Sequence, residues 1–225
     1  MSPWVANRWW DFLKLIVFPS VSALFSLRFS GGQHVPRSGP VLFLCNHQSF
    51  LDPVLVGLAL PRYVRILHRQ SLQKRKWLTW LMGSLRGIPI DHRGFSREGF
   101  QAMLDALAHG DCVAMFPEGE RTHDGPLGDF KPGIALLIKR AHTPIVPVGI
   151  AGAYDAWPRD SKLPRLSPMF MPPTAGTIAV SIGKAIEPSR YEKSSREEML
   201  ADLRRAVSEQ MDRAESLRRK RREAL

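Results

Sequence analysis

The sequence predicts an α/β protein with a mostly parallel central sheet flanked by helices, preceded by an N-terminal membrane-associating helical segment. Short apolar runs of strand length alternate with segments of helical periodicity, which is typical of a largely parallel sheet. Hydrophobic residues make up 44% of the chain, an ordinary globular share that argues against disorder and against a polytopic membrane protein. The 225 residues suffice for one such domain with a small extension.

The predicted strands are four buried apolar runs, at residues 41–45, 112–116, 145–150 and 177–182. Helices are predicted between and after them, at residues 52–60, 96–109, 133–141 and from 194 to the end. Asp52, followed by Pro53, is a good N-cap for the first helix. Ser96 can cap the second helix, and Gly110 can end it.

Residues 1–29 differ in composition from residues 30–225, which are predicted to form the α/β domain. Three tryptophans, Trp4, Trp9 and Trp10, lie at the start of the chain. An apolar stretch at residues 12–27 follows, and Lys14 and Pro19 interrupt it. The stretch is too interrupted to span a bilayer, which takes roughly 18 to 20 apolar residues. Clustered tryptophan favours the membrane interface, so we expect a short helical hairpin or bent helix in one leaflet. The alternative is a helix packed on the domain, and a signal peptide is not favoured.

The formal net charge of +11 favours anionic partners such as phospholipid headgroups or phosphorylated substrates. Nucleic acid is disfavoured because the basic residues are scattered or terminal and form no recognisable module. The basic run at 218–222 is either a solvated helix end or a contact with anionic lipid. Cys45 and Cys112 are predicted to be buried thiols in a reducing compartment, without metal-ligand spacing, so no metal site is expected.

One group of residues that can carry chemistry follows the first predicted strand, at residues 46–52. On a continuous helix His47 and Asp52 would lie about 140° apart, but in a strand-to-helix loop they can meet. A carboxylate on one imidazole nitrogen fixes the tautomer and leaves the other nitrogen as a base. No G-x-S-x-G nucleophile motif occurs, which suits a reaction whose substrate supplies the hydroxyl. The alternatives are that Asp52 only caps the helix and that His47 is an ordinary loop histidine.

Two further segments carry charged residues beside apolar runs. Residues 116–122 form a tight turn after a strand, where α/β ligand sites gather, and Arg121 there can hold phosphate bidentately. Glu118 can hold a substrate hydroxyl or orient a cation. Residues 87–93 are predicted to form a further, short apolar strand ending in Arg93, which alone would be an ordinary surface charge.

Together, in this order, the three segments resemble the glycerolipid acyltransferase family, whose best-known members are the 1-acyl-sn-glycerol-3-phosphate acyltransferases. The family's N-H-x-x-x-x-D block is matched by Asn46, His47 and Asp52. Its G-x-x-x-x-x-R strand is matched by Gly87 and Arg93. Its F-P-E-G-x-R-[ST] block is matched by Phe116, Pro117, Glu118, Gly119, Arg121 and Thr122. A downstream F-K-x-G resembles Phe130, Lys131 and Gly133, and a V-P-V strand resembles Val146, Pro147 and Val148.

The resemblance implies an O-acyltransferase on the cytoplasmic face of a membrane, monotopic or peripheral. His47 is then the general base and Asp52 orients it. The acyl donor is acyl-CoA or acyl-ACP (acyl carrier protein), the acceptor is 1-acyl-sn-glycerol-3-phosphate or a related lysophospholipid, and no metal or other cofactor is needed. The implied substrate-binding residues are Arg69, Arg93, Glu118, Gly119, Arg121 and Thr122.

One residue departs from the family pattern. Glu120 occupies a position that is often Thr, and a carboxylate beside a phosphate site is unfavourable unless it faces away or pairs with an arginine. Two other functions compete with the acyltransferase. A non-catalytic lipid-surface protein would explain the charge and the tryptophans, and a hydrolase could use the same base. The second is disfavoured because no Ser or Cys nucleophile motif or metal-ligand spacing is present.

Overall fold

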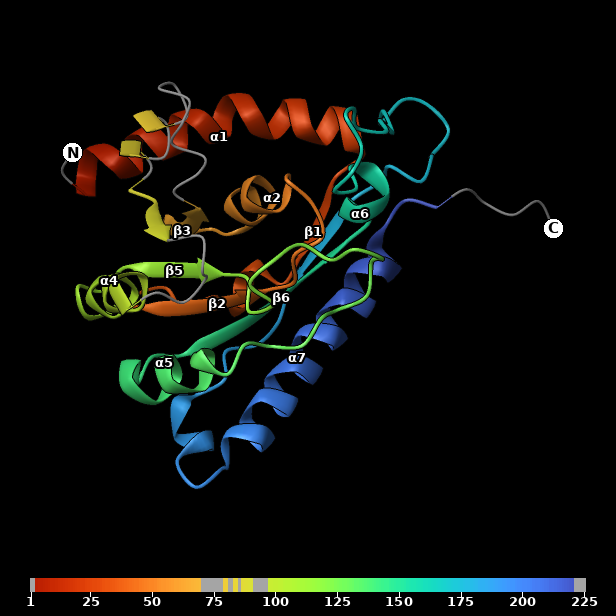
Figure 1. Ribbon diagram of the computed structural model, residues 1–225. Coiled ribbons are helices and arrows are strands. Elements are labelled where there is room, and N and C mark those ends of the chain that lie inside the picture. Colours follow the sequence, from red (N-terminus) through yellow and green to blue (C-terminus); the bar gives the residue numbers. More distant parts are fainter. Residues whose placement is uncertain (1–2, 70–78, 81–82, 85, 91–96, 221–225) are drawn as a thin grey trace.

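The computed structural model describes residues 3–220 apart from 70–78, 81–82, 85 and 91–96. A twisted sheet runs through the molecule with helices on both faces (Figure 1). The strands that the structure describes lie in the order β1-β7-β6-β2-β5-β3-β4. Their bounds are Arg28–Ser30 (β1), Val41–Cys45 (β2), Val64–Arg69 (β3), Ile88–Ile90 (β4), Cys112–Met115 (β5), Ile145–Ala151 (β6) and Ala179–Ile182 (β7). Neighbouring strands are parallel except β6 and β7, so the predicted mostly parallel sheet is confirmed.

The helices divide between the two faces of the sheet (Figure 1). α1 (Pro3–Phe25) and α2 (Asp52–Ala59) cover one face, and α6 (Ala153–Ala156) follows β6 on that side. α4 (Arg97–Ala108), α5 (Gly133–Ala141) and α7 (Arg196–Leu217) cover the other. Two short 3₁₀ turns lie at Gly32–His34 and Pro188–Tyr191.

β2 is the central strand, and all five of its residues are buried. Side chains alternate between the faces of a strand, so Phe43 packs in the core beneath α1 and α2 while Leu42 and Leu44 pack against α4, α5 and α7. Burial on both faces explains why this strand reads as a continuous apolar run. The carboxyl ends of β2 and of its neighbour β5 lie side by side at one edge of the sheet.

Of the helix end signals predicted from the sequence, Gly110 is confirmed. Gly110 has a positive φ of 82° and closes α4, with Asp111 N–H bonded to the Ala106 carbonyl at 3.0 Å. Ser195 and Glu198 form a capping box at the start of α7. Ser96 lies outside the described residues.

The predicted hairpin or bent segment at the N-terminus is instead one continuous helix, α1, with Pro19 inside it. Pro19 is exposed, and the Ser20 hydroxyl donates to the Ile16 carbonyl at 3.0 Å one turn back. A proline that removes a bond on the solvent side leaves the inner face intact, so the helix continues. No helix in the described ranges is both long and apolar enough to cross a bilayer.

The inner face of α1 packs on the domain. Trp10 and Phe25 are buried, and the added Cβ of an alanine at Gly57 would lie 2.4 Å from the Trp10 ring. Lys14 also faces inward, where its ammonium donates to the Leu60 carbonyl at the end of α2 at 2.5 Å. The proposed boundary between residues 29 and 30 falls inside β1, a strand of the same sheet.

Candidate functional site

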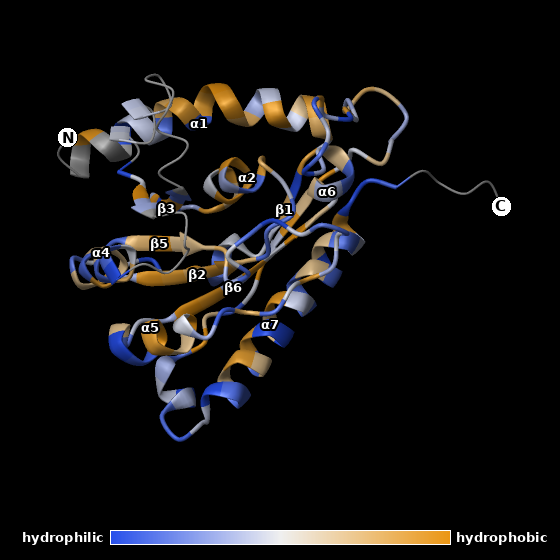
Figure 2. Cartoon of the chain, viewed as in Figure 1, coloured by the Kyte–Doolittle hydropathy of each residue, from blue (hydrophilic) through white to orange (hydrophobic). Residues whose placement is uncertain are grey.

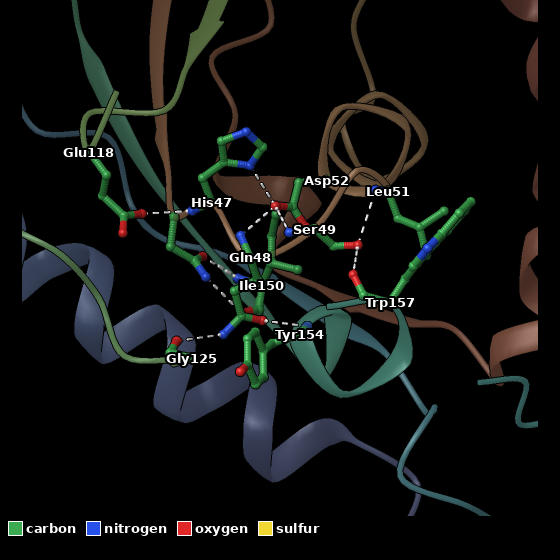
Figure 3. Close-up of polar contacts among 11 residues, drawn as sticks. His47, Gln48, Ser49, Leu51, Asp52, Glu118, Gly125, Ile150, Tyr154 and Trp157 are labelled. Atoms are coloured by element: carbon green, nitrogen blue, oxygen red, sulfur yellow. Dashed lines mark hydrogen bonds and ion pairs between the residues drawn. The ribbon is translucent and has the colours of Figure 1, made fainter. Parts of the chain in front are cut away.

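His47 lies two residues after the end of β2, at the carboxyl edge of the sheet, and its side chain contacts Asp52. Asp52 Oδ2 lies 2.7 Å from His47 Nδ1 (Figure 3). The carboxylate is fully buried, whereas the His47 side chain keeps 18% of its surface exposed. Figure 3 shows the other ring nitrogen pointing away from Asp52. An imidazole held through Nδ1 in this way presents Nε2 as a base toward the open side.

The prediction that Asp52 caps α2 with its side chain is wrong. The N-cap position of α2 is Leu51, and no side chain caps the helix. The Asp52 carboxylate instead turns back over the preceding loop, where Oδ2 also accepts the N–H groups of Gln48 at 2.5 Å and Ser49 at 2.7 Å. Three donors on one oxygen fix the carboxylate beside the imidazole.

The aromatic ring of Phe116 supports the His47 imidazole from the neighbouring strand end. The two rings stack with centroids 4.0 Å apart and an interplanar angle of 17°. Phe116 follows β5, which pairs with β2 in parallel register. The base is therefore held by Asp52 at one nitrogen and by an aromatic surface on one ring face.

Glu118 holds two loops of the site together. Its Oε1 accepts the His47 N–H at 2.7 Å, and its Oε2 accepts the Gly128 N–H at 2.9 Å. The side chain is only 6% exposed. Burial raises the pKa of Glu118, and the bonds from the two N–H groups oppose that rise. Both carboxylate oxygens are thus already engaged by the protein backbone.

The loop after β2 is joined to the neighbouring segments by its polar side chains (Figure 3). Asn46 donates to the Ile150 carbonyl at 2.9 Å and accepts the Ile150 N–H at 2.7 Å. Gln48 donates to the Gly125 carbonyl at 3.2 Å, and the Ser49 hydroxyl donates to the Trp157 carbonyl at 2.8 Å. These bonds fix the loop in place, which positions His47.

The turn after β5 carries Gly119, Arg121 and Thr122. Gly119 has a positive φ of 77°, which a side chain would strain. Arg121 lies over the Phe50 ring, with its guanidinium carbon 3.5 Å from the centroid. The Thr122 N–H donates to the His47 carbonyl at 2.9 Å, while its hydroxyl contacts Asp124 and the Pro126 carbonyl. Thr122 therefore orders the turn that carries Arg121.

Glu120 pairs with an arginine, the arrangement under which a carboxylate is tolerated beside an anion site. Its Oε2 lies 3.5 Å from Arg159 and 3.8 Å from His123. The pairing balances one negative charge locally, and the exposed Glu120 side chain faces solvent.

The structure gives less information on the two other predicted substrate-binding residues, Arg93 and Arg69. Arg93 lies outside the described residues. Arg69 ends β3, and its backbone pairs with Ile90 of β4. No cluster of metal-ligating side chains occurs in the ranges that are described.

Sequence reasoning missed the supporting residues of the site. Ser49 and Gln48 lie inside the first motif at variable positions, and Trp157 and Gly125 contribute backbone carbonyls, which leave no trace in side-chain type. The positioning role of Glu118 toward the backbone of His47 was also missed. The one sequence signal for these supporting contacts is the polar character of residues 46–49, directly after a buried strand.

Comparisons with known proteins find relatives that are acyltransferases. A chloroplastic 1-acyl-sn-glycerol-3-phosphate acyltransferase of Arabidopsis thaliana is 27% identical over 153 residues, covering 66% of this chain and 42% of that protein. The human 1-acyl-sn-glycerol-3-phosphate acyltransferase alpha is 33% identical over 143 residues, covering 60% and 50% respectively. The chain thus spans about half the length of these curated relatives.

The crystal structure of the 1-acyl-sn-glycerophosphate acyltransferase PlsC from Thermotoga maritima has the same fold. It matches with a TM-score of 0.72 and 20% identity, covering 94% of this chain and 78% of that chain. A family model described as Acyltransferase matches residues 26–151, more than half of the sequence, including the loop after β2 and the turn after β5. The chain therefore belongs to the Acyltransferase family.

Proposed function

We propose that the protein transfers a fatty acyl group from a thioester to the hydroxyl of 1-acyl-sn-glycerol-3-phosphate or a related lysophospholipid. The observation that carries this proposal is the pair His47 and Asp52, a histidine base held by a buried carboxylate at 2.7 Å. The relatives whose names state this activity support it.

In the proposed reaction, His47 Nε2 takes the proton of the acceptor hydroxyl as its oxygen attacks the thioester carbonyl. The Asp52 carboxylate stabilises the imidazolium that forms. The carbon–sulfur bond then breaks, and the proton passes from His47 to the departing thiolate. One ester and one thiol are produced, and no acyl-enzyme forms. The thiol belongs to coenzyme A or to acyl carrier protein.

The acceptor's phosphate is proposed to bind beside His47 at Arg121, with Arg93 and Arg69 completing the pocket. Arg121 is stacked on Phe50, which fixes the position of its planar guanidinium in the turn after β5. Glu118, Gly119 and Thr122 shape the turn that carries Arg121.

The protein is proposed to act at the cytoplasmic face of a membrane, because acceptor and product are lipids. α1 offers the apolar surface for that contact. Phe12, Leu15 and Ile16 are 51%, 74% and 52% exposed on its outer face. A net charge of +11 adds attraction to anionic lipid.

Thiol release from an acyl-CoA, measured with and without lysophosphatidate, tests the proposal. Release that depends on the acceptor is expected, and it should fall about 10²- to 10⁴-fold in His47→Ala. His109→Ala, at the exposed end of α4, is the matched control and should keep full activity. Release without acceptor would indicate a hydrolase, and no release with any thioester, acyl-ACP included, would indicate a non-catalytic lipid-surface protein.

A further inference from the structure

Exposed apolar side chains gather on one side of the molecule. Fifteen large hydrophobic side chains are exposed among the described residues, six of them on α1 and five within residues 163–171. Phe50 and Val54 lie at the start of α2, and Trp80 contacts a tryptophan ring of α1. Within this set Leu136, on α5, is the one that belongs to the opposite face of the sheet.

Residues 163–171, which we term the apolar loop, follow α6 and lie at the C-terminal end of α1 (Figure 1). Leu163 is 76% exposed and Phe170 is 81% exposed. Leu166, Met169 and Met171 are exposed as well. Figure 2 shows apolar colour along both α1 and part of this loop. Apolar side chains this exposed in one short segment mark an interaction surface.

The apolar loop is fixed to α1 by backbone hydrogen bonds. Ser167 N–H donates to the Leu24 carbonyl at 2.8 Å, and Met169 N–H donates to the Ala23 carbonyl at 3.0 Å. These carbonyls belong to the last turn of α1, which has no intrahelical donors of its own. Arg219, just after α7, donates to the Pro168 and Met169 carbonyls. The loop and α1 therefore form one preorganised surface.

Basic residues outnumber acidic ones around the apolar loop. Lys162 and Arg165 are exposed, the exposed Asp160 precedes them, and no acidic residue occurs from 161 to 186. The segment after α7 adds Arg219 beside the same loop, while Lys220 pairs with Glu215. Exposed apolar side chains flanked by basic residues match the surface of an anionic phospholipid leaflet.

We propose that the apolar loop is a second membrane-inserting element, which docks the protein on an anionic leaflet together with the outer face of α1. The segment that leads into the loop borders the active site. The Trp157 carbonyl binds Ser49, and the rings of Trp157 and Phe50 lie 6.3 Å apart. Two contacts, at the loop and along α1, define the orientation in which the His47 side meets lipid. The inference rests on the lipid acceptor of the proposed function and adds the site of membrane contact.

A single thiol placed in the loop tests insertion directly. Cys45 and Cys112 are buried at 0% and 3% exposure, so a dye will label an introduced Met169→Cys selectively. The labelled full chain is mixed with phosphatidylglycerol–phosphatidylethanolamine vesicles that carry a spin-labelled lipid in the acyl region. We expect a blue shift of the dye and quenching by the spin label. Leu136→Cys, on the opposite face, is the matched control and should show neither.

A companion measurement is vesicle co-sedimentation of the Leu163→Ser/Phe170→Ser double variant. Its partition coefficient should fall about tenfold or more, while Leu136→Ser leaves partition unchanged.

The dye experiment also has an outcome that would overturn the inference: vesicle-bound protein whose Met169→Cys dye neither shifts nor is quenched. A shift produced by acyl carrier protein without vesicles would assign the loop to a protein partner instead. The same shift is expected in a His47→Ala background, because insertion does not depend on catalysis. Wild-type protein that inserts but releases no thiol from any thioester would refute the proposed function and leave this inference standing.

Discussion

At the scale of single residues, one oxygen of Asp52 organises the candidate base. Oδ2 accepts from His47 Nδ1 and from the two N–H groups of Gln48 and Ser49, which follow His47 in sequence. Oδ1 is buried and makes no hydrogen bond to the described part of the chain. The carboxylate therefore shapes the loop and holds the imidazole with the same atom.

Asp52→Asn separates charge from shape at this position. The Asn carbonyl oxygen can take the place of Oδ2 and accept all three bonds, but it cannot stabilise an imidazolium by charge. We expect kcat to fall by about 10² or more. The free energy of unfolding should fall by only about 1–3 kcal/mol, because the buried NH₂ gains no described partner. Steady-state kinetics and urea unfolding measure the two effects. A normal kcat would disprove the orienting role of Asp52.

Glu118→Gln distinguishes a positioning residue from a substrate ligand. Each Glu118 oxygen accepts one backbone N–H, and the NH₂ of glutamine cannot accept. One N–H, of His47 or of Gly128, loses its partner, so kcat and the free energy of unfolding should both fall, the latter by about 1–3 kcal/mol. Glu120→Gln, at an exposed site, is the control for unfolding. If only the KM for the acceptor rose, Glu118 would instead bind substrate.

The burial of His68 predicts how the stability of the fold changes with pH. Burial lowers the pKa of His68 below its ordinary value of 6.5. A base with a lowered pKa in the folded state contributes stability that is complete above pH 6.5 and declines as the pH falls below that value. Free energies of unfolding at pH about 7.5 and about 5 should therefore diverge more for the wild type than for His68→Leu. His109→Leu, at an exposed site, should show the same pH dependence as the wild type. If His68→Leu lost as much stability between the two pH values as the wild type does, His68 would not be the source of the pH dependence.

At the scale of elements, the sequence predicted those whose signals are local. β2, β5 and α5 begin and end within two residues of the predicted positions, because local apolar patterns mark them. α7 begins two residues after its predicted start, but it ends at Leu217 and does not continue to the end of the chain as predicted. β1 and β3 were missed. β1 has three residues and is defined by its pairing with β7, about 150 residues away. β3 is not a continuous apolar run, because Arg65, His68 and Arg69 interrupt it. The bend predicted at Pro19 is absent, because Pro19 lies on the exposed face of α1 and the helix continues through it.

The same contrast applies to the site. Its two central residues follow from motif order, while the bonds between loops could not be read from the sequence. His47 and Asp52 are five residues apart, and a loop allowed them to meet. The contact of Glu118 with the His47 N–H needs β2 and β5 to be neighbours, which only the sheet order supplies.

The backbone of α7 approaches the sheet closely at Gly149. An added Cβ there would lie 2.1 Å from the backbone of Gln210 and Met211, which cannot move aside as a side chain does. Gly149→Ala should therefore shift α7 and lower the free energy of unfolding by about 1–3 kcal/mol or more. Gly32→Ala is the control, since nothing lies within 4 Å of its added Cβ. Urea unfolding compares the two, and equal stabilities would show that α7 is not held at Gly149.

At the scale of the whole molecule, α1 has two roles that a deletion would confuse. Phe25 and Leu27 are buried in the core, and β1 is a strand of the sheet. Removing residues 1–29 would therefore damage the fold together with any membrane contact. Substitutions on the outer face of α1 avoid this, because Leu15 and Ile16 are exposed and face away from the domain.

The proposed membrane contact combines apolar burial with charge, and the two respond differently to salt. Salt screens the attraction of the +11 net charge to anionic lipid but leaves buried apolar surface unaffected. High salt should therefore weaken vesicle binding without releasing the protein. Leu15→Glu/Ile16→Glu should weaken it at low salt and allow release at high salt, while Leu136→Glu behaves as wild type. Vesicle flotation across a salt series measures both effects. Complete release of the wild type by salt alone would show that charge holds the protein on the membrane and that α1 does not insert.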